Sequence, residues 1–463
     1  MAKPIPPCPQ FSPNRSTPHA HQQYELKLLT PMFGGGVESR IIDVSFPIRP
    51  TSIRGQLQFW WRATIGARYS TPQDLREAQS ALWGGIGSDD QNTALQASQV
   101  RVWVDQVRWE KAKQCAQFEK DGKNPNRFRA APKWNAPFNG TSLPYALFPF
   151  QGQLAKGGQR IEVQPSHFIQ EAQFRLSLQF PTDKCAEIET ALWAWVNFGG
   201  IGARTRRGCG ALYCKSLAPQ DVADLKAAWQ RYMPELYPQR AWPTLASTLL
   251  YHQKECANAI DAWDRVISQF RHFRQGIDLG RNPPSEEDSR RPGRSRFPEP
   301  ETIRAVTRMR CTRHQRISHI PDNAFPRAEF GLPIVFHFKD PGEPPDTTLN
   351  PGRDSEGNKR ERMASPLILK PLALRSGSAI PIILRLNAPS VDTVELYQGS
   401  HPHNLLKPTL IRHPDLANLT VYRNSPLNCS QFLQAKTRET GSALDAFLAY
   451  AGSDMIGFKE VTR

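Results

Sequence analysis

Alternating apolar and polar residues predict strands in the first half of the chain. Residues 23–29 place Tyr24, Leu26 and Leu28 on one face, and a period of two is typical of a strand with one buried face. Residues 100–109 and 173–180 alternate in the same way. A further strand is expected at 211–217, and a short one at 145–150.

A period of 3.6 residues predicts helices between these strands. The first helix begins at Thr51 or Ser52, which are both good N-cap residues. One apolar face follows, made of Ile53, Leu57, Trp60, Trp61 and Ile65. A second helix follows a cap at Asp183, and its apolar face is made of Ile188, Leu192, Trp195 and Val196.

The order of these elements is strand, helix, strand, strand, helix, strand, which is the ferredoxin-like arrangement. The second half repeats the plan less clearly. It predicts a strand at 248–251, a helix at 256–273, a strand at 330–338, a hairpin at 366–374 and 380–386, and a terminal helix at 442–450. The predicted fold class is α+β, with two tandem ferredoxin-like (RRM-like) domains and long loop insertions.

Composition shifts divide the chain into a tail and two domains. The tail, 1–22, is rich in Pro, Ser and His and is expected to be flexible. The first domain, 23–218, carries a polar, basic insertion at 111–143 that is expected to be partly mobile. The second domain, 219–463, carries a basic loop at 281–316 and a polar insertion at 340–361.

The charge balance favours a polyanionic partner. The 463 residues include 59 Lys or Arg and 43 Asp or Glu, for a formal net charge of +16. Such an excess suits nucleic acid, although it could also serve solubility. No apolar run approaches the roughly 18 residues of a transmembrane helix, so no membrane partner is expected. Eight cysteines without a CxxC pair favour reduced thiols and a cytoplasmic location.

Glycines and arginines gather around the first predicted helix. Gly34, Gly35 and Gly36 follow the first strand, and glycines let another backbone approach closely. Arg54 and Arg62 stand two helical turns apart, roughly 12 Å, which matches about two nucleotides of extended backbone. A phosphate chain is therefore a candidate ligand, and solvated or ring-stacked arginines are the alternative.

The strongest local signal lies at 198–210, between a helix and a strand. It includes Gly202, Arg204, Arg206, Arg207 and Gly208. Glycines permit positive φ, and guanidinium groups are fork-shaped donors for phosphate. The Walker pattern is absent, and these glycines end a helix, unlike those of a Rossmann fingerprint. Nucleic-acid contact is favoured over a structural turn.

No catalytic or metal-binding motif stands out. The HExxH and GxSxG patterns are absent. Cys311, His314 and His319 have a spacing that suggests metal, but a strong zinc signal needs a fourth ligand. Asp43 could hold a metal or activate a hydroxyl, and a plain loop aspartate is the favoured interpretation. We therefore expect no enzyme activity, no metal and no cofactor.

Taken together, these motifs resemble a known family. The motif segments are 30–36, 49–57, 59–62 and 202–208, with further similarity at 298–304 and 362–367. They look like the RAMP superfamily and, within it, the first-numbered subunits of the Cmr effector complexes of type III-B CRISPR–Cas systems. The similarity is good over about 24–215 and patchy over 296–374. The tail and both insertions depart from the family pattern.

The resemblance implies paired ferredoxin-like folds and a place in a ribonucleoprotein near the 3′ side of the guide RNA. It implies contacts with guide (CRISPR) RNA, target RNA and other Cmr/RAMP subunits, and no role as the nuclease. The implied RNA-binding residues are Gly34, Gly35, Gly36, Arg49, Arg54, Arg62, Gly202, Arg204, Arg206, Arg207, Gly208 and Arg304.

The leading hypothesis is a non-catalytic RNA-binding subunit that acts in antiviral defence. Its alternative is a RAMP endoribonuclease that processes guide precursors, which needs a general base, usually histidine, beside the glycine-rich loop. No histidine is near 198–210 in sequence. A third possibility is an assembly module whose charge is incidental.

Overall fold

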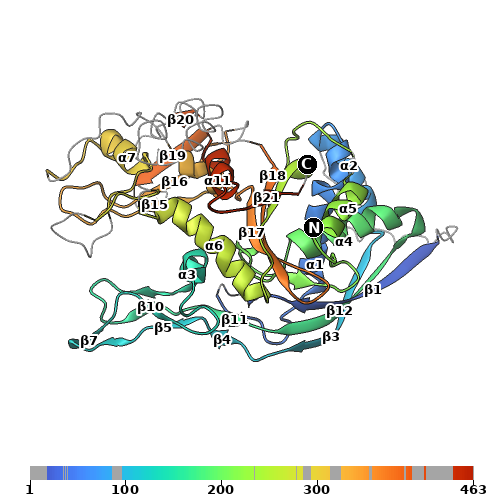
Figure 1. Cartoon of the computed structure of the whole chain (residues 1–463), viewed down its shortest axis with the longest axis horizontal. Helices are drawn as coiled ribbons and strands as arrows, with labels where there is room; N and C mark the ends of the chain where they lie inside the picture. The colour runs from blue at the N-terminus through green and yellow to red at the C-terminus, as the bar shows by residue number, and fades with distance from the viewer. Residues whose placement is uncertain are drawn as a thin grey trace, which may run out of the picture.

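The computed structural model describes most of the chain (Figure 1). The described residues are 18–34, 36, 38, 40–85, 96–233, 235–277, 279–284, 293–312, 325–353, 357–389, 393–398, 411–412 and 442–461. They form a mixed α+β protein with several antiparallel sheets. None of the helices in these ranges is long and apolar enough to cross a membrane.

The first sheet is built by the first half of the chain. Its strands are β1 (His19–Leu28), β3 (Arg101–Trp109), β12 (Ala172–Pro181) and β13 (Leu212–Tyr213), in the spatial order β13-β1-β12-β3. The helices α1 (Pro50–Ala63) and α4 (Cys185–Phe198) connect these strands and pack side by side against the sheet. The predicted strands at 23–29, 100–109 and 173–180 and both predicted helices are therefore present.

The second sheet repeats the same order of elements. Its strands are β14 (Thr244–His252), β17 (Leu367–Ala373), β18 (Ala379–Asn387) and β21 (Lys459–Glu460), in the order β17-β18-β14-β21. The helices α6 (Ala259–Gln275) and α11 (Ala443–Ala451) fall after the first and third of these strands. When the strands of each sheet are numbered along the chain, both sheets have the same spatial order, 4-1-3-2.

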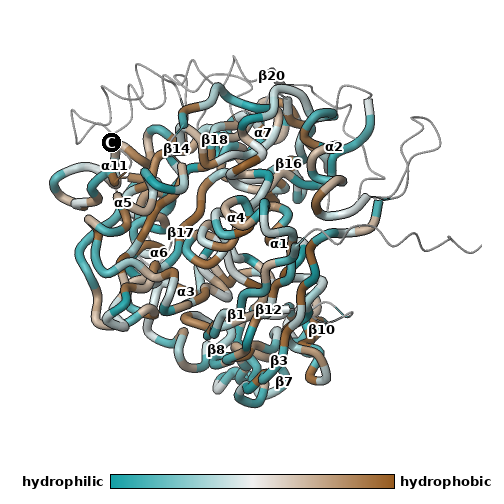
Figure 2. Tube along the Cα trace, turned by 90° about the vertical axis from the view of Figure 1, so that its right-hand side faces the viewer, coloured by the Kyte–Doolittle hydropathy of each residue, from teal (hydrophilic) through white to brown (hydrophobic). Residues whose placement is uncertain are grey.

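The two sheets share one hydrophobic core. Ile53 and Leu57 of α1 belong to the same buried cluster as Ile382 and Leu384 of β18. Leu369 of β17 belongs instead to the cluster around α6 and α11. The layers therefore run first sheet, α1 and α4, second sheet, then α6 and α11, and apolar residues gather along β17 in Figure 2. The second sheet is covered on both faces, which explains why β17 is buried at every position.

The other described elements lie outside the two sheets and their four helices. They are β2 (Met32–Phe33), η1 (Ile65–Arg68), α2 (Pro72–Trp83), β4 (Lys113–Gln114), β5 (Ala116–Gln117), β6 (Lys120–Asp121), β7 (Asn124–Phe128), β8 (Lys133–Trp134), α3 (Leu143–Leu147), η2 (Phe148–Phe150), β9 (Gln153–Leu154), β10 (Ile161–Val163), β11 (His167–Ile169), η3 (Thr182–Lys184), η4 (Thr205–Arg207), α5 (Val222–Tyr232), α7 (Glu299–Thr307), η5 (Pro326–Phe330), β15 (Ile334–Phe336), β16 (Thr347–Pro351), β19 (Thr393–Gln398) and β20 (Ile411–Arg412).

Three predicted element boundaries in the first half were wrong. Helix α1 begins at Pro50, because proline suits the first helical turn, and the cap position is Arg49, not Thr51 or Ser52. Asp183 lies in the 3₁₀ turn η3, so it does not cap α4. The expected flexible tail overlaps β1, since residues 19–22 pair with the end of β12; residues 1–17 lie outside the described ranges.

Three predicted segments have a different secondary structure. Residues 145–150 are helical, because Leu143, Ala146 and Leu147 bury one helical face. The basic loop 281–316 contains α7, whose first turn holds a proline and two acidic residues that favour a helix start. The polar insertion 340–361 contains β16, which pairs between β15 and β19 and buries alternate residues.

Candidate nucleic-acid interface

The two predicted glycine turns meet in space. The Ala203 amide donates to the Phe33 carbonyl at 2.8 Å, and the Gly210 amide donates to the Pro31 carbonyl at 2.9 Å. A Cβ added to Gly202, whose φ is +79°, would lie 2.4 Å from the Phe33 oxygen. Glycine is therefore required at position 202 for this junction. Gly34 faces Ala203 across it, and Gly35 lies outside the described residues.

A surface cavity of about 400 Å³ opens beside this junction, at the N-terminus of α1. Its walls are Met32, Pro47, Ile48, Arg49, Ser52, Ile53, Gly55, Gln56, Ile201, Gly202 and Ala203. Arg49 at the cap position supplies no side-chain acceptor to the first turn of α1. The positive end of the α1 helix dipole therefore lies at the cavity, and this end of a helix favours an anion.

Gly55 lines this cavity with bare backbone. It lies inside α1, where glycine costs about 1 kcal/mol relative to alanine. A Cβ at position 55 would have no atom within 4 Å. Packing therefore does not require glycine here, and the bare backbone leaves room for an approaching ligand.

Arg49 and Asp43 organise the loop that precedes α1. The Arg49 guanidinium pairs with the Asp43 carboxylate at 3.0 Å, and both side chains are partly exposed. Asp43 also accepts hydrogen bonds from the amides of Ser45 and Phe46. These contacts match the favoured interpretation of Asp43 as a loop aspartate, and they leave Arg49 at the cavity edge.

Arg54 and Arg62 hold α2 against α1. The Arg54 guanidinium donates to the Trp83 carbonyl at the end of α2. The Arg62 guanidinium donates to the side-chain oxygen of Gln79 at 3.0 Å, and burial lowers the pKa of Arg62. Their placement does not support the prediction that this pair spans a phosphate chain.

Arg206 and Arg207 reach from η4 into the second half of the chain. Arg206 donates to the Ser365 carbonyl and stacks on Phe59 of α1. Arg207 donates to the carbonyls of Leu367 at 2.7 Å and Phe330 at 3.1 Å. Burial lowers the pKa of Arg206 to about 10 and that of Arg207 to about 9, so both stay charged at neutral pH. These two arginines clamp β17 to the glycine-rich loop.

Arg207 belongs to a guanidinium cluster with Arg204 and Arg274. Arg207 and Arg274 stand 5.3 and 5.5 Å from the centre of the Phe270 ring. Arg204 is exposed at φ 57°, and its charge, with that of Arg274, adds to burial in lowering the pKa of Arg207.

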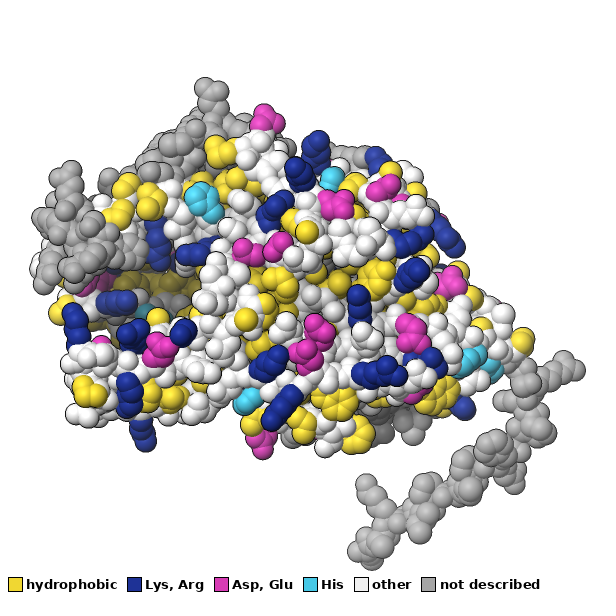
Figure 3. All heavy atoms as spheres, turned by 60° about the horizontal axis from the view of Figure 1, so that its bottom comes forward, with side chains coloured by type: hydrophobic (Ala, Val, Ile, Leu, Met, Phe, Trp, Pro, Cys, Tyr) yellow, Lys and Arg dark blue, Asp and Glu magenta, His cyan; other side chains and the backbone are white. Residues whose placement is uncertain are grey.

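No carboxylate pairs with this guanidinium cluster among the described residues, and the buried Nε of Arg274 has no hydrogen-bond partner there. Clustered positive charge without a counter-charge favours an anionic ligand. Figure 3 shows Lys and Arg side chains, with Asp and Glu among them, over one face of the molecule and around a hollow on its left side.

Gly208 and Arg304 have structural placements. The Trp263 indole N–H donates to the Arg207 carbonyl at 2.6 Å, and Gly208 lies directly beneath that ring. Arg304 is nearly buried in α7, where it pairs with Glu301 at 2.5 Å and Glu343 at 2.6 Å. Neither residue lines the cavity at α1, and the RNA-contact role expected of them stays a prediction.

Lys370 is a buried lysine that the sequence analysis missed. Its side chain on β17 is 1% exposed, and its ammonium donates to the Gly199 carbonyl at 2.8 Å. It therefore ties the second sheet to the start of the glycine-rich loop. Burial lowers the pKa of Lys370 to about 7. The sequence does contain a signal for this residue, since Lys370 lies within an otherwise apolar strand pattern. A charged group in such a strand is buried and needs a hydrogen-bond partner.

Replacing Lys370 by methionine should change how stability depends on pH. Between pH 7 and 10 the unfolded chain binds one proton more at this residue than the folded chain, so wild-type stability rises with pH there. Below pH 7 both states are protonated and the burial penalty is complete. We expect the variant to be more stable than wild type by about 1–3 kcal/mol at pH 6, and this gain to shrink by pH 9.5. Urea unfolding of the variant and of wild type at both pH values measures this difference in stability. Parallel pH profiles of stability for the two proteins would contradict the prediction.

No group of three or more His, Cys, Asp or Glu side chains in the described ranges is arranged to hold a metal ion. Cys311 is buried there, and its amide donates to Glu343. His314 and His319, weighed above as its possible co-ligands, lie outside those ranges.

Residues 25–213 match the RAMP superfamily. The matched segment contains most of the first sheet and both glycine turns. The chain is related, more particularly, to Cmr1 subunits of type III-B Cmr complexes. It is 25% identical over 202 residues to the CRISPR system Cmr subunit Cmr1-2 of Pyrococcus furiosus, covering 42% of this chain and 95% of that protein. It is 23% identical over 180 residues to Cmr1-1 of the same organism, covering 38% of this chain and 44% of that protein.

Solved structures show a loose likeness. A crystal structure of Cmr1 from Pyrococcus furiosus gives a TM-score of 0.42 at 16% identity, covering 84% of this chain and 94% of that chain. A chain from a cryo-EM structure of the type III-B Cmr-beta complex bound to cognate target RNA gives 0.41 at 14% identity, covering 80% of this chain and 95% of that chain.

Proposed function

We propose that this chain is a non-catalytic RNA-binding subunit of a type III-B CRISPR (Cmr) effector complex. In this proposal it contacts guide and target RNA near the 3′ end of the guide and docks against other RAMP subunits in the cytoplasm. Backbone contacts dominate, so the affinity falls steeply with salt.

One observation carries the RNA-binding part of the proposal. The cavity at the N-terminus of α1 ends at Gly202 and Ala203, and the next residue is Arg204 of the guanidinium cluster. We propose that the RNA path runs from the first turn of α1, past Arg49 and two bare glycines, to Arg204 and Arg274, which pair with no carboxylate among the described residues. Its donors suit successive phosphates of one RNA strand. Arg54, Arg62 and Arg206 support this surface from inside the fold.

The assembly part rests on the related proteins. Both curated relatives are described as subunits of a CRISPR Cmr system. The more similar of the two is matched over almost its whole length, and the glycine turns lie within the matched RAMP domain. Because both relatives are named as subunits, we propose a subunit role rather than an enzyme role for this chain.

We also propose that the chain consists of two tandem ferredoxin-like domains, with the boundary near 218–240. The equivalent strand orders of the two sheets support this division. Helix α5, between them, packs Leu225 and Trp229 into the core of the first sheet. The insertion 111–143 belongs to the first domain, and the region 281–361 to the second.

A negative charge introduced into the cavity tests the proposal. In α1, Gly55→Glu places a carboxylate where the phosphate would lie, and it also removes the helix cost of glycine. We expect the RNA affinity of the full chain to fall by about tenfold, because one repulsive charge costs about 1–2 kcal/mol at such a site. Fluorescence anisotropy with a single-stranded 12-nucleotide RNA at low salt measures the change.

Gly55→Ala is the matched control for the added side chain without its charge. It should lose much less RNA affinity than Gly55→Glu, by less than about threefold, while raising stability by about 0.5–1 kcal/mol. Equal affinities for Gly55→Glu and wild type would exclude this cavity. No RNA binding by the wild-type chain would support the assembly-module alternative. Discrete cleavage products from a repeat RNA, formed in the presence of a chelator, would support the endoribonuclease alternative.

A further inference from the structure

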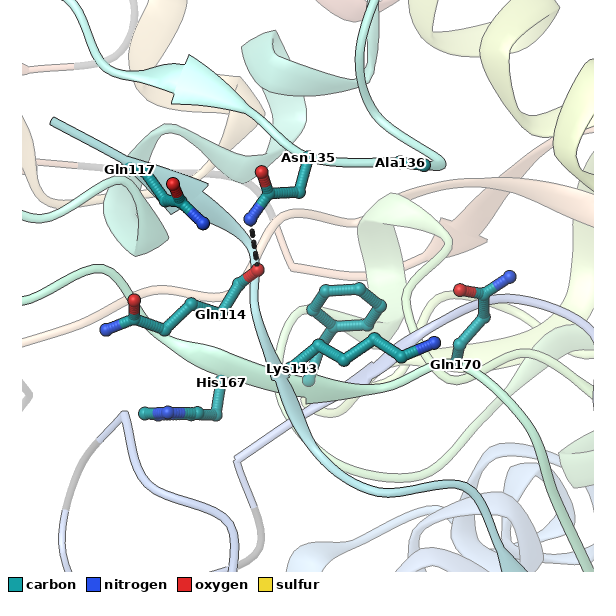
Figure 4. A pocket seen from close by; sticks show the side chains of 8 residues that line it. Lys113, Gln114, Gln117, Asn135, Ala136, His167 and Gln170 are labelled. Carbon is teal, nitrogen blue, oxygen red and sulfur yellow. Dashed lines mark hydrogen bonds between the residues drawn. The ribbon is translucent and has the colours of Figure 1, made fainter. Parts of the chain in front are cut away.

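A second cavity, of about 540 Å³, opens in the insertion and lies apart from the α1 cavity. It is formed where the edge strand β4 pairs with β11, beside the loop that follows β8. Figure 4 shows the side chains that face it: Lys113, Gln114, Gln117, Asn135, His167 and Gln170. Buried Phe168 forms an apolar part of the wall.

Three glutamine side chains that line this cavity are available to bind a ligand. Asn135 uses one N–H to donate to the Gln114 carbonyl at 2.8 Å, which fixes the amide in place. The side chains of Gln114, Gln117 and Gln170 make no hydrogen bond to any described residue. Each carboxamide presents a donor and an acceptor side by side. The cavity therefore offers paired donors and acceptors, an imidazole ring and one ammonium group.

The surrounding insertion is strongly basic. Residues 111–143 contain seven Lys or Arg and two Asp or Glu. One of these acids, Glu119, already pairs with Arg129 and Lys133. Lys113 at the cavity pairs with Glu110 at 3.1 Å, and both of these side chains are about half exposed. A ligand that enters this cavity thus meets a positive field, which favours a phosphate-bearing molecule.

We propose that this cavity binds a single unstacked nucleobase of the RNA. The carboxamides of Gln114, Gln117 and Gln170 hydrogen-bond to the base edge, since amide groups match the donor and acceptor pairs of bases. His167 provides a ring for stacking, and Lys113 lies near the phosphate of the same nucleotide. The inference rests on the proposed RNA-binding function and adds base selection to it.

Base discrimination by the full chain tests this proposal. Anisotropy is measured with 12-nucleotide homopolymers of A, C and U at one salt concentration. We expect the best and worst of these RNAs to differ by about tenfold in affinity for wild type, because one base-reading amide contact is worth about 1–3 kcal/mol. The variant Gln117→Ala/Gln170→Ala should bind all three within about twofold, with the salt dependence unchanged.

Gln153→Ala, an exposed glutamine of β9 outside the cavity, is the matched control and should keep the wild-type discrimination. Wild-type affinities that are equal for the three RNAs, or discrimination that survives in the double variant, would overturn the base pocket. The proposed function would stand in both cases, because RNA would still bind and Gly55→Glu would still weaken it. A wild-type chain without RNA affinity would overturn both.

Discussion

Gly208→Ala should destabilise the protein by about 3–5 kcal/mol. The added Cβ would lie 2.3 Å from Nε1 of Trp263 and 3.0 Å from the Leu369 carbonyl. Trp263 is fully buried and cannot retreat, because its indole N–H donates to the Arg207 carbonyl. The φ of +88° adds strain for any residue with a Cβ. Urea unfolding followed by circular dichroism measures the loss.

Gly157→Ala separates the steric clash from the backbone strain. Gly157 has a similar φ of +92°, but a Cβ there would have no atom within 4 Å. We expect this control to lose only about 1 kcal/mol. If both variants lost the same amount, the contact between Gly208 and Trp263 would not be what holds η4 against α6.

The double variant Arg204→Ala/Arg274→Ala should lower RNA affinity by about 30–100-fold, because each charge-assisted phosphate contact is worth about 1–1.5 kcal/mol. It should also reduce the slope of log affinity against log salt by about 1.4, since two phosphates lose a cation on single-stranded RNA. Anisotropy of the full chain over a salt series gives both quantities. Stability should change by less than about 1 kcal/mol, because lower repulsion around Arg207 offsets the loss of the Arg274 ring contacts.

Arg76→Ala is the control for non-specific charge. Arg76 is exposed on α2, away from the guanidinium cluster, and its loss should change affinity less than about twofold. Unchanged affinity in the double variant would show that these guanidinium groups serve the fold alone. The proposed path from α1 to Arg204 would then be limited to the cavity at Arg49.

Periodicity predicted most elements of both sheets, because an alternating or helical apolar stripe marks a face that must be buried. The alternation in β12 and the helical stripe of Ile53, Leu57 and Trp60 are examples, whereas the two-residue strand β21 was not predicted. Segments whose burial depends on distant strands were missed: polar β16 becomes a strand only between β15 and β19. In the same way, α3 packs against α6, more than 100 residues later in the chain.

The sequence predicted the residue types of the candidate site, but it did not predict which arginines would be exposed and which would be bonded within the fold. Both glycine turns were identified, and the structure brings them together. The sequence alone gives Arg204 and Arg207 the same weight, yet one is exposed and the other is bound by carbonyls of β17 and η5. Only the position of a second, distant segment decides which arginine keeps free donors. The cavity at Gln114 and Gln117 has no local sequence signal, because scattered glutamines are ordinary on a surface.

The shared core has a consequence for synthesis on the ribosome. Helices α1 and α4 are made early, but the strands that cover their second face, β17 and β18, are made more than 150 residues later. Until then the nascent chain exposes an apolar layer that contains Ile53 and Leu57, a state that invites aggregation or chaperone binding. The RAMP match ends at residue 213, whereas the buried cluster around α1 and α4 extends to Val461 beside the second sheet.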